Sequence, residues 1–548
     1  MPKVSELMSS RIGNAMTNVQ TWGSIIYNVK DYGPIGKGRD GTTIQKALND
    51  CSLNGGGTVR IPPGNYILDV PLYIFSNTHL YVDNATIIRG FVDNRAMLTN
   101  GREGAQYDEY DGEKNIVIEG GVWISHPNPV AFGEPRNLFA MAKGVNTIIR
   151  NVTFRDVISF HALDLNGMKD VLIENCRFEG FTDAGGRDFS EAIQIASMTN
   201  FITFGSHDDS PCMNVTIRNC YFGPSDTMGS WGTGVGNHGA AYNKFQQNVI
   251  IENCFFEGCT YAGVRTYLFK DVSIQGKNVF KNCQRGILVN NRLGDGVVVP
   301  PQSGQNLRIV GNLFDGTITN DINIQGARNG SQYDLFENVE IADNVIVRDP
   351  LDQANAMSIR LVKNLSIRGN RLESCFRGIQ TWYCSDVYIL DNLFTNIGRE
   401  AIITDEDDVN LPSGMTTSHH IVNNIVKGAG YNGMFLRYIK GIMVVQNYLE
   451  DTANAEESTR NAISLSTLID GGIVAHNRVR MGTGFQNAYG ISLSASASNV
   501  QLFNNDLQGK TGKILNSGTN NFDGFYIHAP NDTRYRVTVD NTGAIVVV

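Results

Sequence analysis

The stretches VLIENCRF at residues 171–178, VTIRNCYF at 215–222 and VIIENCFF at 249–256 decide the fold that this chain is predicted to adopt. Each begins as an alternating apolar strand, continues through Asn and Cys, and ends in an aromatic residue. Related copies recur from residue 114 to residue 510, among them TIIRNVTF at 147–154 and LRIVGNLF at 307–314. The equivalent residues Ile149 and Ile173 are 24 positions apart. That period is too short for a propeller blade or a helical repeat and is typical of one coil of a parallel β-helix.

A second set of short strands interleaves with the first. It includes HALDLNG at 161–167, EAIQIAS at 191–197, RGILVNN at 285–291 and EAIITDE at 400–406. Each coil is therefore expected to carry at least two strands of period two, joined by tight corners. The chain has 58 Gly and only 15 Pro, and Asn is abundant. Because Gly and Asn tolerate positive φ angles, such corners account for the excess of both residues.

The cysteines are interpreted as core residues. The chain has nine, an odd number, and none of them form a CxxC pair. Buried free thiols are therefore favoured over a disulfide scaffold or a zinc module. Since coils stack about 4.8 Å apart, Cys176, Cys220 and Cys254 are expected to form an interior ladder.

Bulk properties argue against two kinds of partner. The net charge is −9 and no run of Lys and Arg occurs, which argues against a nucleic-acid partner. No 18 consecutive apolar residues are present, so no membrane span is expected. The first residues lack the basic and apolar segments of a secretion signal. The protein is therefore expected to be made in a reducing compartment and to leave the cell by a route other than its own signal.

The open end of a β-helix exposes strand edges that need a cover. Residues 40–51, DGTTIQKALNDC, have the apolar spacing and the N-terminal Asp or Thr cap of a short helix. Together with YNVKDYG at 27–33 and GGGTVRIPPGNYIL at 55–68, this opening resembles that of the pectate-lyase-like superfamily. The resemblance covers about residues 27–510. It implies an all-β, right-handed single-stranded parallel β-helix capped by the helix, and it leaves the substrate open because several activities share the fold.

Segments on both sides of the solenoid are predicted to be separate. Residues 1–26 are predicted to form an amphipathic helix for attachment or oligomerisation, and residues 511–548 a short β-hairpin region with an Asn-Thr-Gly turn. Such additions resemble those of trimeric phage tailspikes, notably the appendage proteins of phages infecting Gram-positive bacteria. This resemblance implies a homotrimer, located on the virion and attached through its N-terminus to tail or baseplate proteins. It also implies action at the host surface on a capsular polysaccharide or wall teichoic acid.

Departures from the period mark the place where a functional site is expected. The intervals from Ile173 to Ile217 and from Ile217 to Ile251 are 44 and 34 residues, so both are predicted to leave the solenoid as loops. Acids, two histidines and a tryptophan on loops over a rigid scaffold are a usual setting for carbohydrate chemistry. The candidates in these loops are Asp183, Arg187, Asp188, Glu191, His207, Asp208, Asp209, Asp226, Trp231 and His238.

Strand parity gives a second indication. Alternation places Leu163 and Leu165 inside the coil, so Asp164 is expected to point outward. The outward residues in register are Asp164, Gln194, Arg265, Leu288, Asn323, Gln380, Ile403, Phe435, Ser464 and Ser492. Among them only Asp164 and Arg265 are charged, and Tyr267 shares their face. The site is therefore predicted between about residues 161 and 267.

Several candidates also have a structural interpretation. The histidines at 161, 207 and 238 suit corners or turn caps, and Arg187 with Asp188 suits a local salt bridge. Asp208 and Asp209 suit a solvated surface with an Asx turn. The block DEDD at 405–408 is interpreted as an exposed loop, with a Ca²⁺ site as the alternative.

Glycoside hydrolysis requires two carboxyl groups, one as acid and one as base or nucleophile. Asp164 and Glu191 are predicted to be this pair, with Asp188 as the substitute for either, and no cofactor is required. Substrate binding is assigned to Arg187, Gln194, His207, Asp208, Trp231, His238, Arg265 and Tyr267. The stereochemistry stays open.

Three alternatives accompany this prediction. A lyase that acts on a uronate-containing polymer would use Arg265, Tyr267 or His238 as its base. A phosphodiesterase that acts on teichoic acid would use acids and histidines around a divalent cation. A receptor-binding spike without catalysis would recognise sugar through Trp231, Tyr242 and Tyr267.

Overall fold

The computed structural model describes residues 25–92, 94–125, 137–183, 186–198, 204–295, 298–348, 353–406, 410–412, 414–455, 459–482, 484, 486–523, 525–528, 534–539 and 545–547. It divides into two units, residues up to Leu307 and residues from Arg308 onward, and each is described by itself. In both units parallel strands stack coil upon coil in three faces, here called A, B and C. The predicted fold class is thereby confirmed: the chain is an all-β, right-handed single-stranded parallel β-helix.

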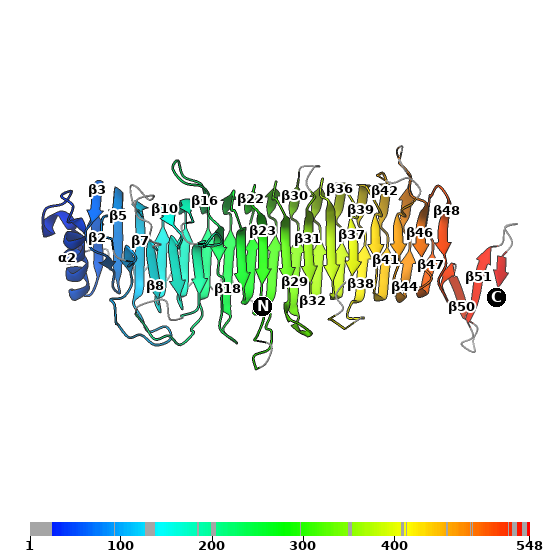
Figure 1. Cartoon of the computed structure of the whole chain (residues 1–548), viewed down its shortest axis with the longest axis horizontal. Coiled ribbons are helices and arrows are strands. Elements are labelled where there is room, and N and C mark those ends of the chain that lie inside the picture. Colours follow the sequence, from blue (N-terminus) through cyan, green and yellow to red (C-terminus); the bar gives the residue numbers. More distant parts are fainter. Residues whose placement is uncertain are drawn as a thin grey trace. The chain divides into compact units, whose positions relative to one another are not determined.

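The first unit begins with the predicted cap (Figure 1). Strand β1 (Ile26–Asn28) and the 3₁₀ turn η1 (Val29–Tyr32) precede helix α2 (Asp40–Leu53), which contacts the first coil. The expected capping interaction is wrong in detail, because the N-cap position is Arg39 and no side chain caps it. Instead, the buried Asp40 carboxylate accepts hydrogen bonds from the backbone N–H groups of Gly36, at 2.6 Å, and Ile67, at 2.7 Å. Asp40 thus joins the start of the helix to the first coil.

Face A of the first unit consists of β2 (Gly57–Ile61), β5 (Thr78–Arg89), β7 (Lys114–Ile124), β9 (Val145–Arg150), β12 (Lys169–Glu174), β15 (Met213–Arg218), β18 (Gln246–Glu252) and β21 (Phe269–Gln275). Face B consists of β3 (Gly64–Leu68), β10 (Thr153–Ile158), β13 (Arg177–Thr182), β16 (Tyr221–Gly223), β19 (Phe255–Glu257) and β22 (Val279–Lys281), and the long strands β5 and β7 reach it. Face C consists of β4 (Leu72–Tyr73), β6 (Leu98–Thr99), β8 (Phe139–Ala142), β11 (Leu163–Asn166), β14 (Glu191–Ala196), β17 (Thr233–Gly236), β20 (Ala262–Tyr267) and β23 (Arg285–Asn290). Strand β24 (Gln305–Val310) contains the boundary between the units.

The second unit repeats the three faces. Face A consists of β29 (Phe336–Ala342), β32 (Val362–Arg368), β35 (Ser385–Leu390), β38 (Thr417–Val422), β41 (Lys440–Val445), β44 (Asp470–Ala475), β47 (Ser498–Phe503) and β49 (Phe522–Asp523). Face B consists of β25 (Leu313–Asp315), β30 (Val345–Val347), β33 (Arg371–Glu373), β36 (Leu393–Ile397), β39 (Ile425–Ala429), β42 (Tyr448–Thr452) and β45 (Arg478–Arg480). Face C consists of β26 (Asn320–Gln325), β31 (Asn355–Arg360), β34 (Arg377–Trp382), β37 (Ile402–Asp405), β40 (Met434–Leu436), β43 (Ile463–Leu465), β46 (Tyr489–Leu493) and β48 (Gly512–Asn516). The antiparallel pair β27 (Ala327–Asn329) and β28 (Gln332–Asp334) projects between β26 and β29.

The register agrees with the predicted period. Ile149 pairs with Ile173 on face A of the first unit, and both side chains are fully buried. The phenylalanines that end the repeats form a stack inside that unit. Successive ring centroids of Phe154, Phe178, Phe222, Phe256 and Phe280 are 4.9, 4.8, 4.7 and 4.9 Å apart. Stacked aromatic pairs at such distances contribute beyond the burial of their area.

The corners between faces A and B explain the Asn and Cys of the repeat. Asn175, Asn219 and Asn253 each have a φ of 54°, a left-handed conformation that Asn adopts more readily than most residues. The cysteines that follow them are buried, and backbone hydrogen bonds of 3.0 and 2.9 Å from the next coil to Cys176 and Cys220 align them. All nine cysteines are free and buried, so the predicted interior ladder is confirmed.

In the second unit a different ladder occupies this corner. Each asparagine donates from its side-chain amide to the next, for instance Asn370 to Asn392 at 2.9 Å and Asn392 to Asn424 at 3.0 Å. The ladder comprises Asn312, Asn344, Asn370, Asn392, Asn424, Asn447, Asn477 and Asn505. Because the amides also bind backbone carbonyls, buried polar groups stabilise the corner here in place of thiols.

The predicted terminal segments lie only partly within the described residues. The predicted N-terminal helix falls on residues 1–26, of which 1–24 lie outside the described residues. Beyond residue 510, β48 pairs in parallel with β46, and β50 (Phe525–His528), β51 (Arg534–Val539) and β52 (Ile545–Val547) form an antiparallel sheet. The predicted Asn-Thr-Gly turn at 541–543 lies outside the described residues. In the part of the chain that the structure describes, no helix has the length and apolar character that a membrane span needs.

Candidate functional site

The outward row of face C contains the predicted residues, which follow Ala140 in register. Asp164 pairs with Gln194 on the next strand, and the row continues through Gly236 to Arg265. The prediction missed Gly236 because β17 lies within a segment that was read as a loop. This correction has a physical reason: TGVG contains two glycines, which hide the apolar alternation of a strand. The row also contains Ser358, between Asn323 and Gln380 in the second unit, which the prediction missed as well.

Glu191, the first residue of β14, is the most enclosed acid of this region. Its side chain is 0% exposed, and both carboxylate oxygens lie at hydrogen-bond distance from Nδ1 of His238, at 3.2 and 3.1 Å. Burial alone would raise the pKa of Glu191, but the hydrogen bond and the charge of His238 outweigh it and lower the pKa below its ordinary value. Glu191 is therefore an ionised carboxylate that holds the His238 ring, and His238, which is 31% exposed, covers it.

His161 lies beside the same carboxylate, with its Nδ1 3.7 Å from Oε2 of Glu191 and its ring stacked against that of His238. Its Nδ1 is 2.7 Å from the backbone carbonyl of Glu191, so that nitrogen carries the proton and donates it. Its Nε2 is 3.4 Å from a terminal nitrogen of Arg187, which donates to it. Burial lowers the pKa of His161. The two bonds and the burial together hold His161 as a neutral imidazole beside Glu191.

Asp164 on the neighbouring strand is a second buried carboxyl group. It accepts side-chain hydrogen bonds from Asn137 at 3.0 Å, Asn166 at 2.8 Å and Gln194 at 3.2 Å. Burial raises the pKa of Asp164, the negative charge of Glu191 adds to the rise, and His161 and the amides only partly oppose it. Two neighbouring carboxyl groups thus have pKa values shifted in opposite directions, a pattern found where an acid and a base work together.

Two arginines border this pair. Arg265 is only 9% exposed, and its guanidinium lies 5.6 Å from the Phe189 ring and 5.0 Å from the Tyr261 ring. Its buried Nε has no hydrogen-bond partner among the described residues. The Arg187 guanidinium packs on Phe160 at 4.7 Å and donates to the backbone carbonyl of Ser159 at 3.0 Å. Both cations are thus fixed in place beside the carboxyl groups.

Three predicted substrate-binding residues lie elsewhere or have structural tasks. Trp231 is fully buried, donates from its indole to the carbonyl of Phe178 at 3.2 Å and stacks on Phe181, so the prediction that it contacts substrate is wrong. Asp208 binds the fully buried Lys143 and accepts from the backbone N–H of Ser210 at 2.9 Å, which is an Asx turn. Burial would raise the pKa of Asp208, but Lys143 and Ser210 lower it well below its ordinary value. His207, next to it, is exposed.

The remaining candidates lie at the margin. Asp188 is exposed and forms no ion pair or side-chain hydrogen bond with a described residue, so it does not join the two buried carboxyl groups. Tyr267 is partly exposed at the end of β20, where Asn237 holds its backbone through bonds of 2.9 and 3.3 Å. Tyr242 is 42% exposed, and Arg292 lies 5.7 Å from its ring. These residues are accessible from solvent but are not part of the carboxylate cluster.

Two features of the site were not predicted from the sequence. Asp164 and Gln194 pair across neighbouring strands, and His161 and Glu191 precede them by three positions each. The same register therefore pairs His161 with Glu191, a signal that the spacing contained. Phe189 had no such signal, since only the fold of the loop brings its ring to 5.1 Å from His238.

The described residues give little support for a metal site. They contain no group of three or more His, Cys, Asp or Glu side chains placed to hold an ion. In the acidic block at 405–408, Asp405 pairs with Arg437, and Glu406 accepts from the backbone N–H groups of Gly414 and Thr416, both at 2.8 Å. Residues 407 and 408 lie outside the described part.

Family models cover parts of the chain. The model named right handed beta helix region matches residues 138–329, and the model named periplasmic copper-binding protein (NosD) matches residues 308–538. The candidate site, from His161 to Tyr267, falls within the first match. The described residues of the second match offer no group of three ligands, so they do not fit a bound copper ion.

Two curated proteins are similar in sequence. Plasmin and fibronectin-binding protein A of Streptococcus pneumoniae R6 is 30% identical over 439 residues, 69% of this chain and 60% of that protein. Probable rhamnogalacturonase C of Aspergillus niger is 26% identical over 266 residues, 45% of this chain and 55% of that protein. The chain therefore spans less than two thirds of the length of either relative.

Two solved structures of similar architecture span most of the chain. The surface adhesin PfbA of Streptococcus pneumoniae has 19% identity, with 96% of this chain and 98% of that chain covered and a TM-score of 0.49. The tailspike protein of E. coli bacteriophage HK620 in complex with a pentasaccharide has 13% identity, with 92% and 81% covered and a TM-score of 0.46.

Proposed function

We propose that the first unit hydrolyses a bacterial surface glycopolymer, a capsular polysaccharide or wall teichoic acid, at the face C cluster. The observation that carries the proposal is the pair of buried carboxyl groups with opposite pKa shifts, Asp164 raised and Glu191 lowered. Hydrolysis of a glycosidic bond needs one protonated and one ionised carboxyl group at neutral pH. A purely structural pair has no need of this asymmetry.

Asp164 is the general acid in this proposal. Its raised pKa keeps the proton that must pass to the leaving glycosidic oxygen. Asn137, Asn166 and Gln194 donate to the two oxygens of this carboxyl group and fix its orientation.

The base is Glu191 acting through His238. The carboxylate is fully covered, and in the neutral form of His238, which is the form that acts as base, Nδ1 donates to it and Nε2 has the lone pair. Nε2 takes a proton from the attacking water while Glu191 stabilises the cationic ring that forms. This assignment differs from direct proton transfer to Glu191 because no face of that carboxylate is exposed.

Substrate is held by the cations and polar groups around the pair. Arg265, with an unpaired buried Nε, and Gln194, with an unpaired buried Oε1, have hydrogen-bonding capacity that no described residue uses. Tyr267 and Phe189 supply partly exposed rings beside them. The likeness to a probable rhamnogalacturonase supports action on a glycan chain. Attachment to a virion as a homotrimer through the N-terminal segment belongs to the same proposal and rests on the sequence resemblance alone.

The test is incubation of the protein with purified Gram-positive capsule and with purified wall teichoic acid. We expect new reducing ends, with neither the ultraviolet absorbance of an unsaturated uronate nor released phosphate monoester. Unsaturated products would show a lyase and phosphate a phosphodiesterase. Intact polymer in every case would contradict catalysis.

A second candidate function is adhesion without catalysis. It is favoured by one observation, the relative at 30% identity that is named for binding plasmin and fibronectin. Binding of either protein by the wild type and by Glu191→Gln alike, with every polymer left intact, would favour adhesion over hydrolysis.

A further inference from the structure

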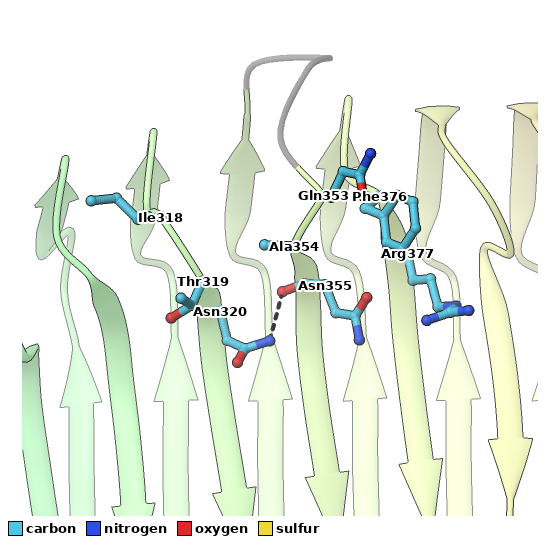
Figure 2. Close-up of a pocket in the computed structure, with 8 residues that line it drawn as sticks. All are labelled: Ile318, Thr319, Asn320, Gln353, Ala354, Asn355, Phe376 and Arg377. Carbon is cyan, nitrogen blue, oxygen red and sulfur yellow. Dashed lines mark hydrogen bonds between the residues drawn. The ribbon is translucent and has the colours of Figure 1, made fainter.

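The second unit has a polar pocket where the face C strands β26, β31 and β34 begin (Figure 2). Its volume is about 460 Å³. The residues that line it include Ile318, Asn320, Gln353, Asn355, Phe376 and Arg377. Amides, one aromatic ring and one cation therefore converge on a single hollow, a combination typical of sites for small polar ligands.

The amides are held in place by the strand register. Asn355 pairs with Arg377 across β31 and β34. The side chain of Asn320 donates to the backbone carbonyl of Asn355 and to the hydroxyl of Ser358, both at 3.2 Å, and the first of these bonds is drawn in Figure 2. The side chain of Asn355 donates to Gln380 at 2.7 Å. These bonds leave Oδ1 of Asn355 as an acceptor that no described residue uses.

The Arg377 guanidinium is held in place, but described residues do not use all of its hydrogen-bond donors. Nε of Arg377 donates to Glu400 at 2.8 Å, and its guanidinium lies 5.3 Å from the Phe376 ring. The two terminal nitrogens form no hydrogen bond with a described residue, and the side chain is 19% exposed. Glu400 is also 3.7 Å from Arg399, so two arginines share one carboxylate. Among these three side chains the net charge is therefore positive.

The geometry points to a binding site for an acidic sugar unit of a glycan, separate from the cluster of the first unit. The terminal nitrogens of Arg377 meet the sugar carboxylate, as a guanidinium fork does best. Oδ1 of Asn355 accepts from a sugar hydroxyl, and Phe376 supplies the apolar wall. The site is proposed to hold its ligand without cleaving it, because Glu400, 3% exposed, is bound by two arginines and none of the described residues that line the pocket carries a carboxyl group.

The test is isothermal titration of the full chain with tetragalacturonate, with the neutral tetrasaccharide maltotetraose and with inorganic phosphate. We expect binding of tetragalacturonate, at least tenfold weaker binding of the other two, and a loss of at least about tenfold in Arg377→Gln. Asn355→Ala, which keeps the ion pair with Glu400, is expected to weaken binding about threefold or more. Arg371→Gln is the matched control, because Arg371 is an exposed arginine of β33 that also pairs with a glutamate, Glu373, at 2.7 Å.

Binding within twofold of wild type in both pocket variants would overturn the inference, as would no binding by the wild type. Equal binding of maltotetraose would show that the pocket does not recognise the sugar carboxylate, and equal binding of phosphate would show a simple anion site. Either result overturns the inference. The titration is repeated in Arg265→Ala, which alters the first unit. Tetragalacturonate affinity that survives there and is lost with Arg377→Gln supports the pocket, and the reverse result refutes it. The inference is independent of the hydrolysis proposed above.

Discussion

Glu191 in the first unit and Glu400 in the second begin the same short sequence, EAIQ and EAII, and both are buried at the same end of a face C strand. Their neighbours differ. Glu191 meets His238 and His161, whereas Glu400 meets two arginines, Arg377 and Arg399. A carboxylate beside histidines can exchange protons through them near neutral pH, but one held by arginines cannot. The scaffold fixes the place of the acid, and the neighbouring residues decide whether it acts in chemistry or in structure.

The largest effect is expected from the acid of the first unit. Asp164→Asn keeps the shape of the side chain but removes its proton, so hydrolysis should fall about 10³-fold. In the wild type, activity requires protonated Asp164 and falls as pH rises through its raised pKa. Initial rates of reducing-end formation across pH check this alkaline limb. Residual activity in Asp164→Asn should lack the alkaline limb, and an unchanged profile would rule out Asp164 as the acid.

A smaller loss is expected from the histidine that covers Glu191. His238→Ala removes the nitrogen that takes the proton from water, and the rate should fall about 10²-fold. His207→Ala, an exposed histidine of a neighbouring loop, is the control and should stay near the wild-type rate. Equal rates for His238→Ala and His207→Ala would contradict the proposal that His238 transfers the proton between water and the buried Glu191.

The corner ladders of the two units predict a difference in stability. Asn392→Ala leaves the buried backbone and side-chain N–H groups of Asn370 without their acceptor, at a cost of about 2 kcal/mol. Cys220→Ala at the equivalent corner of the first unit loses only weak sulfur contacts and a small volume, about 1 kcal/mol. Urea unfolding of both variants measures the order, and a larger loss for Cys220→Ala would contradict it.

The smallest effect concerns Glu400. Glu400→Gln weakens its bonds to Arg377 and Arg399, and the free energy of unfolding should fall by about 1 kcal/mol. Hydrolysis should not change, because the proposed chemistry lies in the first unit. A drop in rate as large as that of Asp164→Asn, with the fold intact by circular dichroism, would remove the distinction between the two glutamates.

Much of this arrangement could be predicted from the sequence, because a β-helix converts the residue period directly into register. The pairing of Ile149 with Ile173 and the outward row from Asp164 to Arg265 follow from spacing and parity. The corner asparagines were read as turn formers, which is right for those at positive φ. The sequence could not distinguish such a residue, for example Asn423 with a φ of 57°, from the next one, Asn424, whose amide is buried in a ladder.

The loops were less predictable, since their contacts depend on closure in three dimensions. Because Trp231 lies in a glycine-rich segment, the sequence predicts an exposed ring, yet the ring is buried and stacks on Phe181. Asp208 suggested a ligand contact, yet it neutralises the buried Lys143. His238 was a candidate among several residues, and only the fold of the segment after β17 brings its ring onto Glu191.

The most direct test of the central claim is the rate of polymer cleavage by Glu191→Gln beside Glu400→Gln. Both substitutions replace a buried carboxylate by an amide of the same shape, so differences in folding are minimised. The predicted result is a loss of about 10²-fold in new reducing ends for Glu191→Gln and a rate within twofold of wild type for Glu400→Gln. A Glu191→Gln protein that is folded and cleaves every polymer of the wild type at the wild-type rate would contradict the claim.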